Sequence, residues 1–136
     1  MTACLDTDVI VRFLTGDDPA KQQKAGELFA RVVAGELALT VTPMAVADAV
    51  FVLTSPNLYA VPRPDAAEML ISLLTHPGFL VEHKSRMIVA LTIFRSHNLD
   101  FSDAYTAAVA LEDQSPEVVS YDRDFERVFG LRRTEP

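Results

Sequence analysis

Four aspartates stand where a carboxylate can act on a substrate: Asp6, Asp48, Asp103 and Asp122. Asp6 and Asp122 each follow a short apolar run that is predicted to be a strand. Ligands of open α/β sheets bind just outside the carboxyl ends of the strands. If these two strands are neighbours, their carboxylates share one rim, where mutual repulsion raises each pKa and a divalent cation relieves it. The chemistry indicated is metal-assisted hydrolysis of a phosphodiester.

Each of these acids also has a purely structural interpretation. Asp6 can cap the helix that follows it. Asp103 falls in the first turn of a helix for which Ser102 is the candidate N-cap, and the helix macrodipole favours a carboxylate there. Asp48 interrupts a run, residues 44–53, that is otherwise apolar on every side. Such a helix is expected to be buried, and a carboxylate inside it must be paired, protonated or bound to metal.

The elements that carry these acids alternate between strands and helices. Strands are expected at 3–5, 37–41, 79–81 and 117–122, with a small edge strand at 131–134, and helices from 9, from 17–19 to 35, over 44–53, 65–75 and 85–97, after 102 and over 123–127. This order implies a parallel sheet covered on both faces. We therefore expect one domain over residues 1–136, with a three-layer α/β/α fold and a mainly parallel sheet of four to five strands.

The composition of the chain further restricts the classes of function that the sequence allows. The chain has 136 residues, a net charge of −7 and a single cysteine. That charge argues against simple electrostatic wrapping of nucleic acid, but it is compatible with carboxylates gathered for a divalent cation. The sequence shows no signal peptide and no apolar run long enough to span a membrane. Cys4 lies in the first expected strand and is predicted to be buried and inert, which fits a reducing cytoplasm.

Four segments together resemble a known family. They are Leu5–Arg12 (LDTDVIVR), Thr42–Leu53 (TPMAVADAVFVL), Leu99–Ala104 (LDFSDA) and Val119–Phe125 (VSYDRDF). Their order and spacing are similar to those of PIN-domain ribonucleases of the VapC type, the toxin half of a type II toxin–antitoxin pair. The resemblance extends over nearly the full chain.

The resemblance implies a five-stranded PIN fold and an acidic site that binds Mg²⁺ or Mn²⁺. Asp6 and Asp103 match the principal metal ligands, while Asp48 and Asp122 match the other two acids of the site. Ser120 matches a hydroxyl residue that orients the metal ligands without itself binding the metal. The resemblance also implies RNA cleavage to 5′-phosphate and 3′-hydroxyl ends, a homodimer, and a small antitoxin that covers the site.

Two departures from the family pattern leave alternatives open. Asp8 stands where these toxins usually have Asn, and Asp48 stands where they usually have Glu. One alternative is therefore a catalytically weak PIN-like module that binds RNA or a partner protein. Another is a phosphatase, since Asp6-Thr7-Asp8 has the spacing of a nucleophilic aspartate and its acid. However, the sequence around Asp6 lacks the Lys and the phosphate-binding Ser or Thr motif that a phosphatase would have.

Overall fold

The computed structural model describes residues 2–136. The strands are β1 (Thr2–Cys4), β2 (Ala38–Val41), β3 (Phe79–Val81), β4 (Glu117–Val119) and β5 (Arg132–Thr134). The helices are α1 (Thr7–Leu14), α2 (Pro19–Val33), α3 (Pro43–Thr54), α4 (Arg63–Leu74), α5 (Lys84–Ser96), α6 (Phe101–Ala110) and the 3₁₀ helix η1 (Arg123–Arg127). The expected α/β/α class with parallel strands is confirmed.

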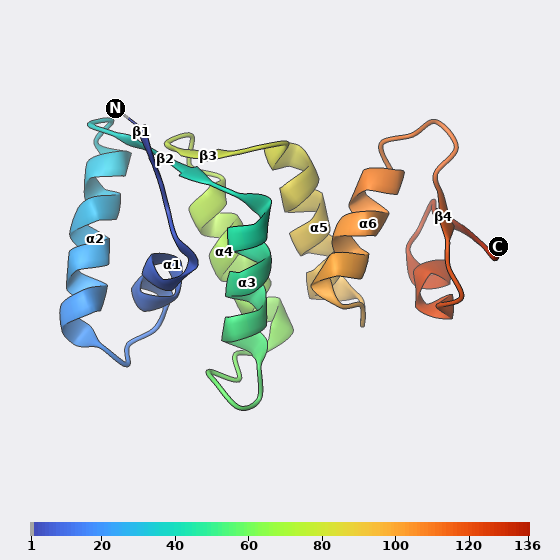
Figure 1. The fold of residues 1–136 in the computed structure, drawn as a ribbon, viewed down its shortest axis with the longest axis horizontal. Helices are drawn as coiled ribbons and strands as arrows, with labels where there is room; N and C mark the ends of the chain where they lie inside the picture. Colours follow the sequence, from blue (N-terminus) through green and yellow to red (C-terminus); the bar gives the residue numbers. More distant parts are fainter. Residues whose placement is uncertain (1) are drawn as a thin grey trace.

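The five strands form two separate parallel sheets. One has the order β1-β2-β3, with Ala3 opposite Leu39 and Thr40 opposite Leu80. The other pairs β4 with β5. Figure 1 shows β1 and β4 towards opposite ends of the long axis of the molecule, with α3 to α6 between them. The strands that precede Asp6 and Asp122 are therefore not neighbours in this arrangement.

Local sequence signals explain where several helices begin. The Thr42 hydroxyl accepts a hydrogen bond from the Ala45 amide at 3.1 Å, and Pro43 follows as the first helical residue of α3. Asp18 caps α2 in the same way, through the Lys21 amide at 3.1 Å. Both caps satisfy amides that the helix leaves free. The N-cap of α6 is Asp100 and not the predicted Ser102.

The first strand is more exposed than its sequence predicts. Thr2, Ala3 and Cys4 are all exposed, so the predictions of a buried strand and a buried cysteine are wrong. The physical reason is the position of β1 in the sheet. It pairs with β2 on one side only, and no strand among residues 2–136 covers its other edge.

Helix α3 is also buried on one face rather than on all sides. Ala45, Val46 and Val50 lie in the core, whereas the side chains of Met44 and Phe51 are 73% and 68% exposed. Asp48 lies on this exposed face. The expectation that Asp48 is buried is therefore wrong, because apolar composition alone does not distinguish a fully buried helix from one with an uncovered apolar face.

Arg63 fixes the end of α5 and the start of α6. Its guanidinium lies 3.8 Å from the ring centre of Phe94 and donates hydrogen bonds to the carbonyls of Phe94, His97 and Leu99. Burial lowers the pKa of Arg63, and the negative charge of Asp100 opposes that effect. One partly buried cation thus holds the turn that leads into the acidic first turn of α6.

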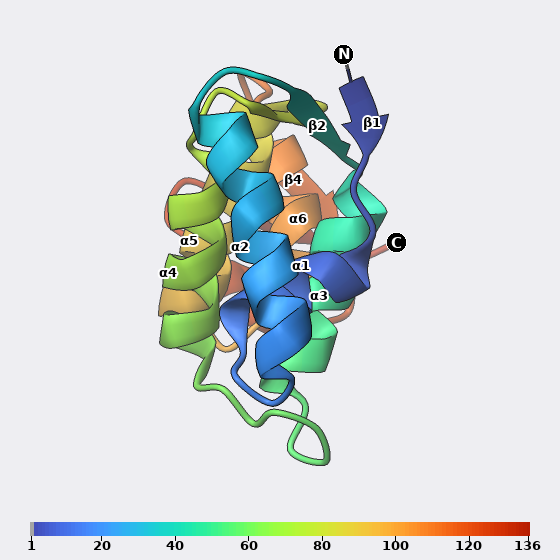
Figure 2. The same cartoon turned by 90° about the vertical axis from the view of Figure 1, so that its left-hand side faces the viewer.

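Helices α1 and α2 lie against each other beside the three-stranded sheet. Figure 2 shows α2 in front of α1, with β1 and β2 beside the upper end of α2 and above α1, and α4 on the opposite side of α2 from α1. Phe29 of α2 is buried against Phe13 of α1 and Phe79 of β3, with ring centres 4.7 and 5.1 Å apart. Within residues 2–136, none of the helices combines the length and apolar character that crossing a bilayer requires.

The exposure of Cys4 gives a direct test of this arrangement. We expect iodoacetamide to alkylate Cys4 in the native protein at a rate close to that of the denatured chain, because no strand shields the thiol. Mass spectrometry of timed samples measures the rate. Strong protection of Cys4 until denaturant is added would contradict an uncovered β1 edge.

Candidate active site

Asp6 and Asp48 form one half of the candidate site. Asp6 follows β1 and occupies the N-cap position of α1, but its side chain makes no capping hydrogen bond. Asp48 projects from the exposed face of α3. Both carboxylates line the same two adjoining cavities, of about 340 and 410 Å³. The structural interpretation of Asp6 as a helix cap is thus not supported, and its oxygens remain available to a ligand.

The spacing of this half is set by contacts between α1 and α3. The Thr7 hydroxyl donates a hydrogen bond to the Ala45 carbonyl at 3.2 Å, which joins the first turns of the two helices. Asp8 lines the larger of the two cavities beside Asp6 and Asp48, and it is exposed. Three carboxylates therefore border the larger cavity.

Asp103 and Asp122 form the other half. Asp103 is the third residue of α6, and Asp122 is the N-cap of η1. The Asp122 carboxylate accepts a hydrogen bond from the Asp124 amide at 2.9 Å, and the Ser120 hydroxyl oxygen accepts one from the Asp122 amide at 2.9 Å. Burial raises the pKa of Asp103, and the charges of Asp100, Asp122 and Asp124 raise it further.

The structure brings the four predicted acids together as two pairs and not as one pocket. Within residues 2–136, no three Asp, Glu, His or Cys side chains are close enough to hold one metal ion. The separation follows from the sheets, because Asp6 belongs to the end of β1 and Asp122 to the loop after β4. Each of these strands has one edge that pairs with no strand of the described chain.

Within residues 2–136, no arginine or lysine forms an ion pair with any of the four acids. The ion pairs of this part of the chain involve other carboxylates, such as Arg86 with Glu112 at 2.6 Å. Two of them border the site: Arg127 with Asp124 at 3.7 Å and Arg12 with Asp17 at 3.2 Å. Unpaired carboxylate oxygens are the ligands that Mg²⁺ prefers, and Mg²⁺ usually takes only one or two of them from a protein. The donor chemistry of each pair therefore fits a divalent cation.

Two parts of the site were not predicted from the sequence. Asp100 and Asp124 add negative charge around Asp103. Asp100 lies three residues before Asp103 and Asp124 lies two residues after Asp122, so the sequence did contain a signal for both. The other part is a network around Arg12, whose Nη1 lies 3.2 Å from Asp17 Oδ1. Tyr59 donates a hydrogen bond to Asp17 Oδ2 at 2.6 Å, and this bond is the main reason why the pKa of Asp17 is lowered. Tyr59 is distant in sequence, so no local signal predicted this contact.

Comparison with known families agrees with the fold. The PIN domain family matches residues 3–131 of the sequence, so the chain belongs to that family. PIN domains are generally nucleases that use divalent metal ions and bind RNA. No protein with a curated description matches the sequence.

The raised pKa of Asp103 predicts that this side chain destabilises the metal-free protein. The pKa lies above the ordinary value of 3.8, so the folded state binds more protons than the unfolded state over that interval. The free energy of unfolding then falls as pH rises through the interval, and the penalty is fully present at neutral pH. We expect Asp103→Asn, in chelator at pH 7, to raise Tm by about 1–3 °C.

Asp65 provides a matched control, because it is the third residue of α4 just as Asp103 is the third residue of α6. Asp65→Asn removes only a favourable interaction with the helix macrodipole, so its Tm should stay level or fall. Saturating Mg²⁺ should stabilise the parent more than Asp103→Asn, because binding to the folded state adds to stability. Equal Tm shifts for the two variants without metal would contradict the assignment.

Proposed function

We propose that this chain is a metal-dependent endoribonuclease that hydrolyses RNA phosphodiester bonds. The observation that carries the proposal is the pair of unneutralised carboxylates, Asp6 and Asp48, that line the same cavities at the carboxyl end of β1. Membership of the PIN family supports the nuclease class. Hydrolysis in which water attacks phosphorus and the P–O3′ bond breaks would leave a 5′-phosphate and a 3′-hydroxyl.

Each pair is proposed to supply one metal ligand and one residue that holds water. Asp6 and Asp103 are proposed as the principal ligands of Mg²⁺ or Mn²⁺, and Asp48 and Asp122 as holders of water. A bound divalent cation would polarise the phosphoryl oxygen, lower the pKa of a bound water and stabilise the leaving oxygen. Ser120 orients Asp122 through the backbone amide, and Asp8 adds negative charge beside Asp6.

The biological setting proposed is that of a toxin in a type II toxin–antitoxin pair. The similarity of the four acidic segments to VapC-type PIN domains supports it. In that setting the partners are an RNA substrate, a small antitoxin that covers the site, and a second copy of the chain in a homodimer.

One observation favours a second function. The four acids lie as two pairs, without a group of three in residues 2–136. A chain that stays in this arrangement would be a weak nuclease and would act as a module that binds RNA or a partner protein.

We expect Asp6→Asn to lower metal-dependent cleavage of a single-stranded RNA by at least ~100-fold, equivalent to ~2.7 kcal/mol of activation free energy. The substitution removes one carboxylate charge from an exposed position, so circular dichroism and Tm should change little. Gel analysis of labelled RNA with Mg²⁺ or Mn²⁺ measures the rate.

Asp65→Asn is again the control, since it makes the same chemical change in a carboxylate that lines neither cavity. It should cleave at the parent rate. If Asp6→Asn also cleaves at the parent rate, Asp6 is not part of the site. If the parent gives no metal-dependent product, the binding module is the better description.

A further inference from the structure

The basic side chains of this acidic protein are nearly all engaged by other groups. Of the twelve lysines and arginines, nine form side-chain hydrogen bonds or ion pairs. Those nine are Arg12, Arg31, Arg63, Lys84, Arg86, Arg95, Arg127, Arg132 and Arg133. Within residues 2–136, the side chains of Lys21, Lys24 and Arg123 make neither kind of contact. These three cations are therefore available to a ligand.

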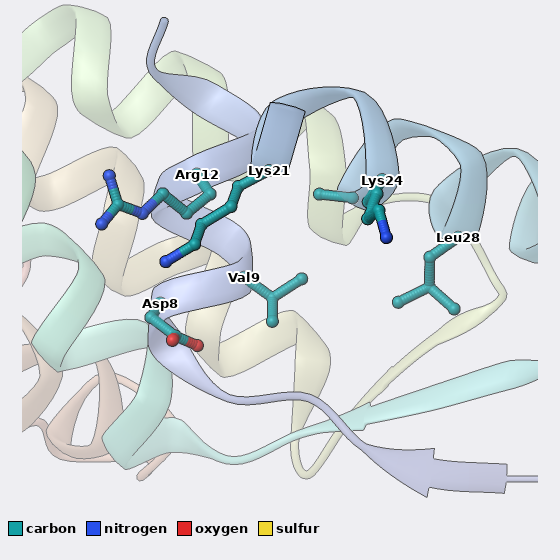
Figure 3. Close-up of a pocket in the computed structure, with 7 residues that line it drawn as sticks. Asp8, Val9, Arg12, Lys21, Lys24 and Leu28 are labelled. Carbon is teal, nitrogen blue, oxygen red and sulfur yellow. The ribbon is translucent and has the colours of Figure 1, made fainter. Parts of the chain in front are cut away.

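Two of the three line one cavity between α1 and α2. We call this cavity of about 300 Å³ the basic groove; it is lined by Asp8, Val9, Arg12, Lys21, Lys24, Ala25 and Leu28. Figure 3 shows Lys21 and Lys24 on α2 across from Asp8, Val9 and Arg12 on α1. Lys21 and Lys24 are three residues apart, so they share one face of α2.

The groove combines positive charge with an apolar base. Three cations line the groove with a single carboxylate, Asp8, and one of them, Arg12, also contacts Asp17. The two lysines thus leave positive charge in the groove of a protein whose net charge is −7. Val9 and Leu28 are half-buried and Ala25 is buried, which gives an apolar floor between the charged side chains. A ligand that carries repeated negative charges on an otherwise less polar framework suits this combination.

The groove is continuous with the candidate active site. Asp8 and Arg12 line both the basic groove and the larger cavity that contains Asp6 and Asp48. The Arg12 guanidinium is held at this junction by its 3.2 Å contact with Asp17, which Thr15 and Tyr59 orient in turn. A strand of RNA lying in the groove therefore leads directly to the carboxylates.

We propose that the basic groove binds the phosphodiester backbone of single-stranded RNA next to the nucleotide that is cut. Lys21 and Lys24 contact successive phosphates, and Arg12 contacts the phosphate nearest to the acidic pairs. This assignment rests on the proposed nuclease function. A nuclease with unneutralised carboxylates repels RNA, so binding of the substrate requires cations beside the site. The basic groove supplies these cations.

The test is the salt dependence of RNA binding by Lys21→Gln/Lys24→Gln, measured by fluorescence anisotropy with a labelled single-stranded oligonucleotide. The measurements are made in chelator, so that no cleavage occurs. Each phosphate contact contributes ~0.7 to the slope of log K against log salt for single strands. Loss of two contacts should reduce that slope by about 1.4 and weaken binding roughly 25-fold at ~0.1 M salt.

The control is Arg31→Gln/Arg132→Gln, which removes the same total charge from two exposed arginines outside the groove. For this control, the slope of log K against log salt should equal that of the parent. Both double variants should keep the parent's circular dichroism spectrum and Tm within the small range expected of surface substitutions. An equal fall in slope for the two would show a general charge effect and overturn the proposal.

Cleavage by the same proteins with Mg²⁺ separates this inference from the function on which it rests. If the parent cleaves RNA and the lysine variant binds it with the parent's slope, the groove assignment is wrong and the nuclease function stands. If the parent binds RNA through the lysines but cleaves none, the nuclease function fails and the groove stands as an RNA site. If the lysine variant loses affinity only for a polyglutamate peptide, the groove takes an acidic protein, and the proposal is overturned.

Discussion

Repulsion between carboxylates that have no cation partner is the constraint on which this site depends. The protein carries a net charge of −7, yet its arginines pair with acids elsewhere, as Arg95 does with Glu68 and Arg133 with Glu126. Exposed pairs of this kind contribute little to stability, typically below ~1 kcal/mol. Their effect on the site is indirect, because cations engaged elsewhere do not neutralise Asp6 or Asp103. Burial raises the pKa of Asp103, and the charges of Asp100, Asp122 and Asp124 raise it further.

The scaffold holds these acids without using their carboxylates as structural groups, Asp122 excepted. The contact between Thr7 and the Ala45 carbonyl fixes the start of α1 against α3, and so sets Asp6 relative to Asp48. Arg63 fixes the turn before α6 through three backbone carbonyls, and so sets Asp103. In both places uncharged backbone groups carry the structural interaction. A metal ion or a substrate could then change the charge state of the acids without undoing the fold.

Local rules predicted the helices, the parallel strands and the acidic positions, but not which surfaces meet. Thr42 and Asp18 cap helices as their residue types predict, because a cap depends on residues three apart. The exposure of Cys4 and Asp48 depends instead on what lies beside β1 and α3. That is decided by strand pairing between distant segments, which apolar periodicity does not encode. The family match supports the fold, while the division into two sheets comes from the coordinates alone.

The basic groove and the divided acidic site are two responses to the same electrostatic problem. An RNA strand brings one negative charge per nucleotide towards carboxylates that already repel one another. Cations placed among the acids would form ion pairs with them and would compete with a metal ion. Cations placed one helix away, as Lys21 and Lys24 are on α2, attract the backbone and leave the carboxylate oxygens free. Arg12 lies at the boundary, where it lines the cavity of Asp6 and Asp48, but its guanidinium pairs with Asp17 and not with those acids. If the groove binds RNA as proposed, the separation of the positive groove from the negative site is what lets an acidic protein bind a polyanion.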